Sequence, residues 1–159
     1  MAAMRAAARL ALCVLCVLPV TAAAKPRGCL TRSEMVTEEL VRHGVFLREA
    51  SRLCEDRTPG GAKMWQDFDT TFDKQLSGQT ARRITVFKRE FPTAWLQMMT
   101  YFDGRMVTNY RYNHPTDGAF CKDVLALLKK NQRGGWGTFS RQAKVIQDNV
   151  RLDFRTCGP

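Results

Sequence analysis

The sequence contains few of the groups that most enzyme active sites use. Histidine occurs only twice in 159 residues, at His43 and His114, and neither residue belongs to an H-E-x-x-H motif. No G-x-S-x-G nucleophile motif occurs, and the GGWG segment at 134–137 lacks the lysine of a phosphate-binding loop. We therefore predict a non-enzymatic protein with no cofactor, no metal site and no catalytic residue.

Long hydrophobic runs are also missing. The uncharged apolar run at 10–20 is too short to cross about 30 Å of hydrocarbon as a helix, and no later run is longer. Arg5 and Arg9 precede this run, and small residues up to Ala24 follow it, which is typical of a secretory signal peptide. We predict a signal peptide at 1–24, cleaved near Ala24, and one secreted or periplasmic domain at 25–159 with no transmembrane segment. The alternative is an N-terminal helix that is retained as a membrane anchor.

Acidic residues are too few to balance the basic ones. Lys and Arg total 25 and Asp and Glu total 15, which gives a net charge of +10. Residues 1–24 carry two arginines and no acid, so the predicted mature chain keeps +8. A basic surface attracts anionic polymers, phosphate-rich lipid or acidic proteins in a salt-dependent way, although the charge could serve solubility alone. A nucleic-acid partner is disfavoured, because no nucleic-acid-binding motif is present.

Four of the six cysteines lie in the predicted mature chain, at Cys29, Cys54, Cys121 and Cys157. None of them forms a C-x-x-C motif or lies near a histidine in sequence, which argues against a metal or redox site. An even number in a small exported domain indicates two disulfides. The helix expected between Cys29 and Cys54 would hold them about 35 Å apart, which disfavours that pair. We favour Cys29–Cys157 with Cys54–Cys121, and the pairing Cys29–Cys121 with Cys54–Cys157 remains open.

Helical periodicity dominates the mature chain. The first pattern begins at a capping box of Thr31 and Glu34 and continues to about Cys54. A second pattern ends at Gly78, and a third covers about 80–102, where Pro92 either kinks or divides it. Two more patterns, at about 117–133 and 138–154, are joined by GGWG. The sequence therefore predicts an all-α fold, a compact four- or five-helix bundle that two disulfides hold together.

One segment departs from this periodicity. Residues 106–112 (MVTNYRY) are rich in β-forming side chains and lack a helical stripe. Turn-forming residues lie on both sides, at 103–104 and 113–115. We predict a short extended connection around 105–115, in the form of a loop or a short strand.

The candidate binding residues are the cations of one predicted helix and the aromatic residues near the predicted connections. Arg82 and Arg89 lie two turns apart on the same side of their helix. Trp136, between glycines, either packs back onto the bundle or projects as a binding anchor. We predict that the following residues bind a protein or an anionic envelope partner: Arg82, Arg83, Lys88, Arg89, Tyr110, Tyr112, His114 and Trp136.

Two alternative functions remain open. A small hydrolase of envelope polymers would use a carboxylate as general acid, assisted by His114. The acidic side chains, among them Glu38, Glu39 and Glu49, are instead expected mostly on exposed helix faces. A carrier of a small apolar ligand would need a cavity inside the bundle.

Overall fold

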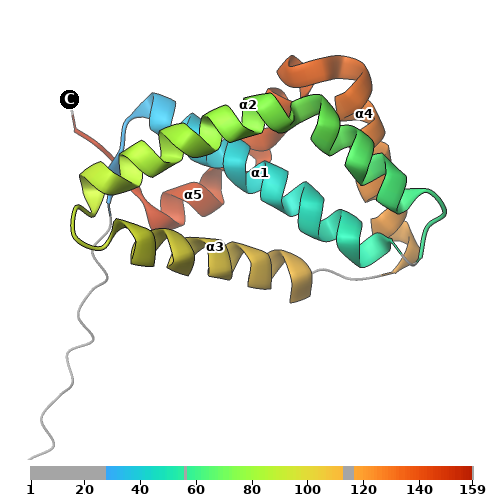
Figure 1. Ribbon diagram of the computed structural model, residues 1–159, viewed down its shortest axis with the longest axis horizontal. Coiled ribbons are helices and arrows are strands. Elements are labelled where there is room, and N and C mark those ends of the chain that lie inside the picture. Colours follow the sequence, from blue (N-terminus) through green and yellow to red (C-terminus); the bar gives the residue numbers. More distant parts are fainter. Residues whose placement is uncertain (1–27, 56, 113–116, 159) are drawn as a thin grey trace, which may run out of the picture.

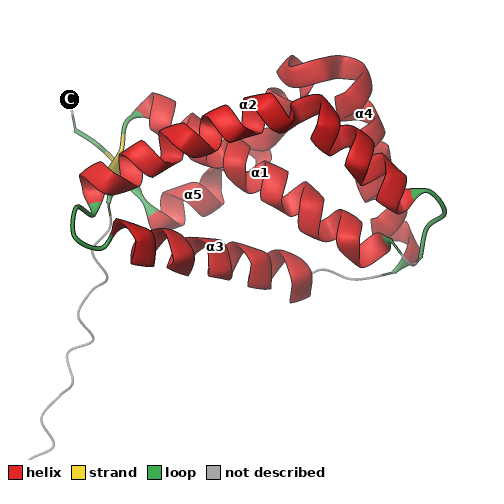
Figure 2. Ribbon diagram, viewed as in Figure 1, coloured by secondary structure: helices red, strands yellow, loops and turns green. Residues whose placement is uncertain are grey.

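Helix α1 lies at the centre of the structure, and helices α2, α3, α4 and α5 contact it (Figure 1). The computed structural model describes residues 28–55, 57–112 and 117–158. Helix is the dominant structure (Figure 2), so the predicted all-α bundle with two disulfides is confirmed. None of the helices in these ranges is long and apolar enough to cross a membrane. The elements in chain order are β1 (Cys29–Leu30), α1 (Arg32–Cys54), α2 (Gly61–Glu90), α3 (Trp95–Tyr112), α4 (Gly118–Ala143), the 3-10 turn η1 (Lys144–Ile146), α5 (Gln147–Asp153) and β2 (Arg155–Thr156).

Helix α1 begins at the predicted capping box. The Thr31 hydroxyl accepts a hydrogen bond from the Glu34 backbone N–H, and the Glu34 carboxylate accepts one from the Thr31 N–H at 2.8 Å. Fourteen of the 23 residues of α1 are buried, because other helices cover most of its circumference. The expectation that Glu38, Glu39 and Glu49 are exposed is therefore wrong, since all three are buried. A surface helix would bury one stripe only, whereas a central helix also buries its polar side chains.

Helix α2 is one continuous helix of 30 residues, so the predicted end at Gly78 is wrong. Gly78 faces open space and remains helical, because a single glycine weakens a helix by only about 1 kcal/mol. The helix ends at Glu90, and Phe91 adopts a non-helical conformation just before Pro92. Of the two alternatives at Pro92, the division into two helices is confirmed. This break reverses the chain into α3, which also packs on α1 (Figure 1).

The predicted extended connection around 105–115 is wrong for the residues that the structure describes, because α3 continues as a helix to Tyr112. Phe102, Met106 and Tyr110 are buried at four-residue spacing, on the side of α3 that faces the bundle. Burial of this stripe outweighs the β propensity of the neighbouring residues, since propensity is a weak effect beside tertiary packing. Residues 113–115 of the predicted connection lie outside the described residues.

A sharp kink divides α4 into a first limb (118–134) and a second limb (136–143). Gly135 lies at the kink with φ 64° and ψ −167°, a conformation that favours glycine. The predicted GGWG link therefore lies between two helical limbs, which meet in a kink at Gly135. Trp136 packs back on Phe139, with ring centroids 5.0 Å apart, and on Phe72 at 6.0 Å. Of the two alternatives for Trp136, the structure shows the packed one.

The disulfides have the pairing that is favoured from the sequence. Cys54 at the end of α1 is bonded to Cys121 in the first turn of α4. Cys29 is bonded to Cys157, next to the two-stranded parallel sheet in which Cys29 is paired with Arg155 and Leu30 with Thr156. One bond therefore fixes α4 on α1, and the other joins the two ends of the folded region.

Candidate functional site

The predicted basic cluster on α2 does not form one surface. Arg83 is only 3% exposed and points into the bundle, so it is not available to a partner. Lys88 lies over the Trp95 ring, with its Nζ atom 4.8 Å from the ring centroid. Arg82 is exposed and lies beside Arg89 in a groove of about 440 Å³.

Arg89 is exposed but its charge is paired within the chain. Its guanidinium donates to Glu34 at 2.9 Å and to Glu90 at 2.8 Å. The hydrogen bonds that Arg89 donates to Glu34 and Glu90 raise its pKa, and the bond to Glu34 is the main cause that lowers the pKa of Glu34 to about 2. The anionic partner predicted for this helix would therefore compete with two carboxylates that already occupy Arg89.

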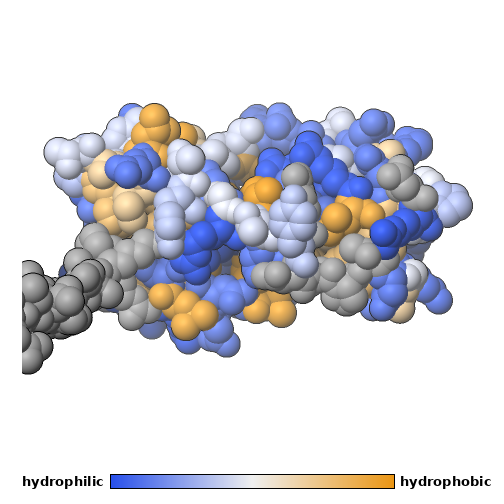
Figure 3. All heavy atoms as spheres, turned by 90° about the horizontal axis from the view of Figure 1, so that it is seen from below, coloured by the Kyte–Doolittle hydropathy of each residue, from blue (hydrophilic) through white to orange (hydrophobic). Residues whose placement is uncertain are grey.

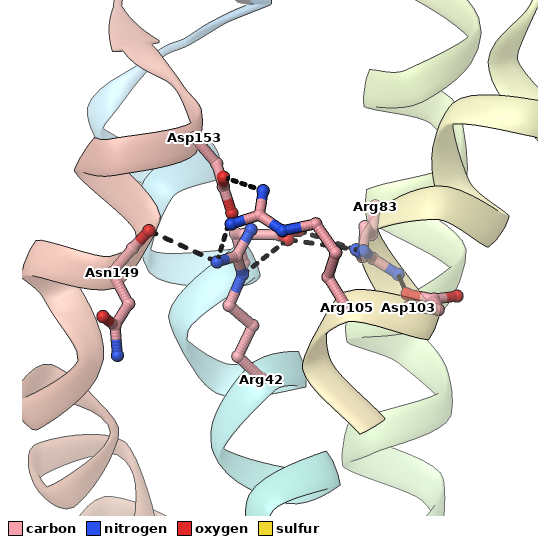
Figure 4. A network of polar contacts seen from close by, with 7 residues as sticks. Arg42, Arg83, Asp103, Arg105, Asn149 and Asp153 are labelled. Carbon is pink, nitrogen blue, oxygen red and sulfur yellow. Dashed lines mark hydrogen bonds and ion pairs between the residues drawn. The ribbon is translucent and has the colours of Figure 1, made fainter. Parts of the chain in front are cut away.

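Arg83 belongs to a central ion-pair network that joins α1, α2, α3 and α5 (Figure 4). Glu38 at its centre accepts from Arg42 Nε at 2.9 Å and from Arg83 Nε at 2.7 Å. Burial alone would lower the pKa of Arg83, but the charges and hydrogen bonds of Glu38 and Asp103 hold it above its usual value. We use the name central ion-pair network for three arginines and three acids: Glu38, Arg42, Arg83, Asp103, Arg105 and Asp153.

A groove of about 440 Å³ lies over this network, between α3 and α5. Arg42 and Arg105 converge on Asp153, at 2.8 Å and 2.6 Å, so the cations beside the groove are already paired. Arg42 also donates to the backbone carbonyl of Asn149 at 3.3 Å (Figure 4). The cations at this groove are therefore already paired with a carboxylate. These ion pairs hold α3 and α5 on α1.

The aromatic candidates are divided between interior and surface. Tyr110 is buried, its ring lies edge-on to Phe46 at 5.4 Å, and burial is the main cause that raises its pKa. Tyr112 is 72% exposed, whereas Trp136 packs on the core. His114 lies outside the described residues. On the face that Figure 3 shows, apolar side chains form separate patches among hydrophilic ones.

A buried histidine, which could not be recognised as buried from the sequence, lies between α1 and α4. His43 is buried against the rings of Phe46 and Phe139, with centroid distances of 6.1 Å and 5.2 Å. Within the described part of the chain, neither His43 nitrogen has a hydrogen-bond partner, and polar atoms of Glu39, Asn131 and Gln142 also lack one. Burial lowers the pKa of His43 to about 4, and neighbouring Gln142 only partly offsets this. The fold therefore holds His43 as neutral imidazole.

The neutral state of His43 predicts a loss of stability in acid. The unfolded histidine titrates near pH 6.5 and the folded one near pH 4, so only the unfolded state gains a proton between these values. This difference should lower the free energy of unfolding by about 3 kcal/mol as the pH falls from 7 to 4. Urea unfolding at pH 7, 6, 5 and 4 should show this loss in the wild type and a much smaller one in His43→Phe.

Glu39→Gln is a control for the direction of the pH dependence, because its effect on stability in acid should be opposite to that of His43→Phe. Burial raises the pKa of Glu39, so its ionisation destabilises the fold as the pH rises, and acid relieves that cost. Glu39→Gln removes this relief, and its loss of stability in acid should be larger than that of the wild type. An identical pH dependence in the wild type and His43→Phe would contradict the role assigned to His43.

A group of exposed cations lies on α4 and was not recognised as a unit from the sequence. They lie on one side of the first limb, opposite the buried stripe of Cys121, Val124 and Leu128. No ion pair among the described residues involves them. Their spacing of three, four and seven residues was the sequence signal that could have found them. We call this set the cationic stripe: Lys122, Lys129, Lys130 and Arg133.

The cationic stripe ends in a groove of about 520 Å³ at the kink of α4. We call it the kink groove, and its lining is Ala126, Lys129, Lys130, Arg133, Gly134 and Thr138. The described residues contain no group of three or more His, Cys, Asp or Glu side chains that could hold a metal ion. Attraction of anions is thus the chemistry that this surface supports best.

These features define a small helical domain with two disulfides and a cationic stripe on α4. No protein-family model, curated protein or solved structure matches the chain.

Proposed function

We propose that this chain is an exported, non-enzymatic domain that binds an anionic partner through the cationic stripe on α4. The observation that carries the proposal is the contrast between two sets of cations. On α2, Arg83 and Arg89 are paired with carboxylates, and the exposed Lys74 and Arg82 are eight residues apart. On α4, the stripe instead places three exposed cations within residues 129–133, and none of them has an ion pair among the described residues.

The local sequence explains this excess of positive charge. Residues 124–147 contain five Lys and Arg residues and no Asp or Glu. Asp123 is the nearest acid on the first limb, and it lies beside Lys122 at the far end from the kink. A surface of one sign raises the local concentration of ligands of the other sign and speeds their association.

The export part of the proposal is supported by the covalent structure. Disulfides persist in oxidising compartments and are rare in a reducing cytosol. The signal peptide expected at 1–24 lies outside the described residues. The hydrolase alternative is less well supported, because Glu38 and Glu49 are held by arginines inside the chain.

Retention on a heparin column at increasing sodium chloride tests the proposal. The stripe variant combines Lys129→Gln, Lys130→Gln and Arg133→Gln. It should elute at roughly half the salt concentration of the wild type, because it removes three clustered cations. The matched control combines Arg32→Gln, Lys74→Gln and Arg82→Gln, all of them exposed and away from α4.

The control removes the same net charge from a different surface, so it separates a site from total charge. It should elute close to the wild type. Equal shifts for the two variants would show that only the net charge matters, and the proposed binding surface would then be wrong.

A further inference from the structure

The kink groove combines positive charge with a defined shape. Lys129, Lys130 and Arg133 line it from the first limb, and Thr138 lines it from the second. Arg141 on the second limb donates to the Thr138 hydroxyl at 3.0 Å, so a fourth cation lies next to the groove. None of the described residues that line the groove is acidic.

The positive charges in this groove repel one another. Lys129 and Arg133 are four residues apart on one helix, and Lys130 and Arg133 are three apart, which places like charges on neighbouring turns. In the described ranges no carboxylate pairs with any of the three. An anion bound between the three cations would be attracted to each of them, and it would also reduce the repulsion among them.

The backbone at the kink does not cancel the positive electrostatic potential that these cations create in the groove. The carbonyl end of the first limb and the amide end of the second limb meet at Gly134 and Gly135, so their opposite helix dipoles offset each other. The Thr138 hydroxyl donates to the Gly134 carbonyl at 3.0 Å. A Cβ atom at Gly134 would lie 2.2 Å from Thr138 Oγ1. The close contact between residues 134 and 138 at the groove therefore requires glycine at position 134.

We infer that the kink groove binds a phosphate group, an inference that rests on the proposed function and specifies its partner. A carboxylate carries one negative charge and two acceptor oxygens, whereas a phosphate monoester carries nearly two charges at pH 7 and three terminal oxygens, which suits three clustered cations better. Lysine serves phosphate as a point charge, and the arginine fork can bind two of its oxygens. The phosphate comes either from a lipid headgroup or from a soluble molecule.

Three probes at equal ionic strength test the inference on the purified chain. They are vesicles of phosphatidic acid in phosphatidylcholine, inorganic phosphate and poly-glutamate, with backbone amide shifts at 126–138 and vesicle co-sedimentation as readouts. Vesicle binding with competition by inorganic phosphate identifies a headgroup, and saturable shifts with phosphate alone identify a soluble source. The stripe variant should bind the vesicles about 100-fold more weakly than the wild type if the source is lipid. Preference for poly-glutamate, or no saturable response to either phosphate probe, would overturn the inference.

Gly134→Ala separates this inference from the proposed function, because it changes the groove without changing charge. It should weaken the response to phosphate at least several-fold and shift heparin elution far less than the stripe variant does. Lys130→Gln provides a second test at an exposed position if Gly134→Ala alters the circular dichroism spectrum. If heparin retention depends on the stripe but phosphate binding is absent, the phosphate inference is wrong and the proposed function stands.

Discussion

Glu38→Ala is expected to lower the free energy of unfolding by about 3–5 kcal/mol, the largest effect that we predict for a single substitution in this chain. The change removes the carboxylate that both Arg42 and Arg83 contact through Nε, at 2.9 Å and 2.7 Å. Each of these arginines is 3% exposed, so their charges would remain buried with one acidic partner each, Asp153 and Asp103. Chemical denaturation at pH 7 gives the measurement.

The exposed pair of Lys63 and Asp67 provides the matched control. These residues are also one turn apart, with Nζ 2.9 Å from the carboxylate, but both side chains are at least half exposed. Asp67→Ala should cost less than about 1 kcal/mol, because water and salt screen an exposed pair. If Glu38→Ala cost no more than Asp67→Ala, the central ion-pair network would not hold the four helices together as described.

Loss of the Cys54–Cys121 bond is the second large effect. The bond spans 67 residues, and removal of a cross-link of that length through Cys54→Ala with Cys121→Ala should cost about 4 kcal/mol. The loss arises mainly because the unfolded chain gains freedom. Thermal and urea unfolding of the double variant should show a lower midpoint with helical content retained in the cold.

The two disulfides should also differ in their response to a reductant. Cys54 and Cys121 are fully buried, whereas Cys29 and Cys157 are partly exposed. Since thiol exchange needs access to a sulfur atom, dithiothreitol should open Cys29–Cys157 first under native conditions. Alkylation followed by peptide mass mapping at successive times gives the order, and earlier labelling of Cys54 would contradict it.

The fold could be predicted where one local rule decided the outcome. The capping box at Thr31 marked the start of α1, and Pro92 marked the break between α2 and α3. The length of α1 disfavoured a bond between Cys29 and Cys54, and the structure contains the pairing that was preferred among the rest. The errors arose where tertiary packing opposed local preference, at Gly78 inside α2 and at Tyr110 in α3.

The candidate site was harder to predict, because exposure depends on the position of a helix in the bundle. Arg82, Arg83 and Arg89 are close in sequence, yet the first is exposed, the second is buried and the third is paired. Arg83 points into the bundle because it forms an ion pair with Glu38, which is buried by the central position of α1. The cationic stripe could have been predicted from the helical spacing of its residues. The kink groove could not, because it depends on the backbone conformation at Gly135.

The Cys29–Cys157 bond also has a mechanical consequence. Its two cysteines lie on either side, in sequence, of the five α-helices that the structure describes, and their Cα atoms are 4.9 Å apart. A pulling force applied to the chain before Cys29 and after Cys157 passes directly through the sulfur atoms and does not stretch the helices between them. While this bond is intact, the bundle can be tethered at either end, or held between two attachments, without being unfolded by tension.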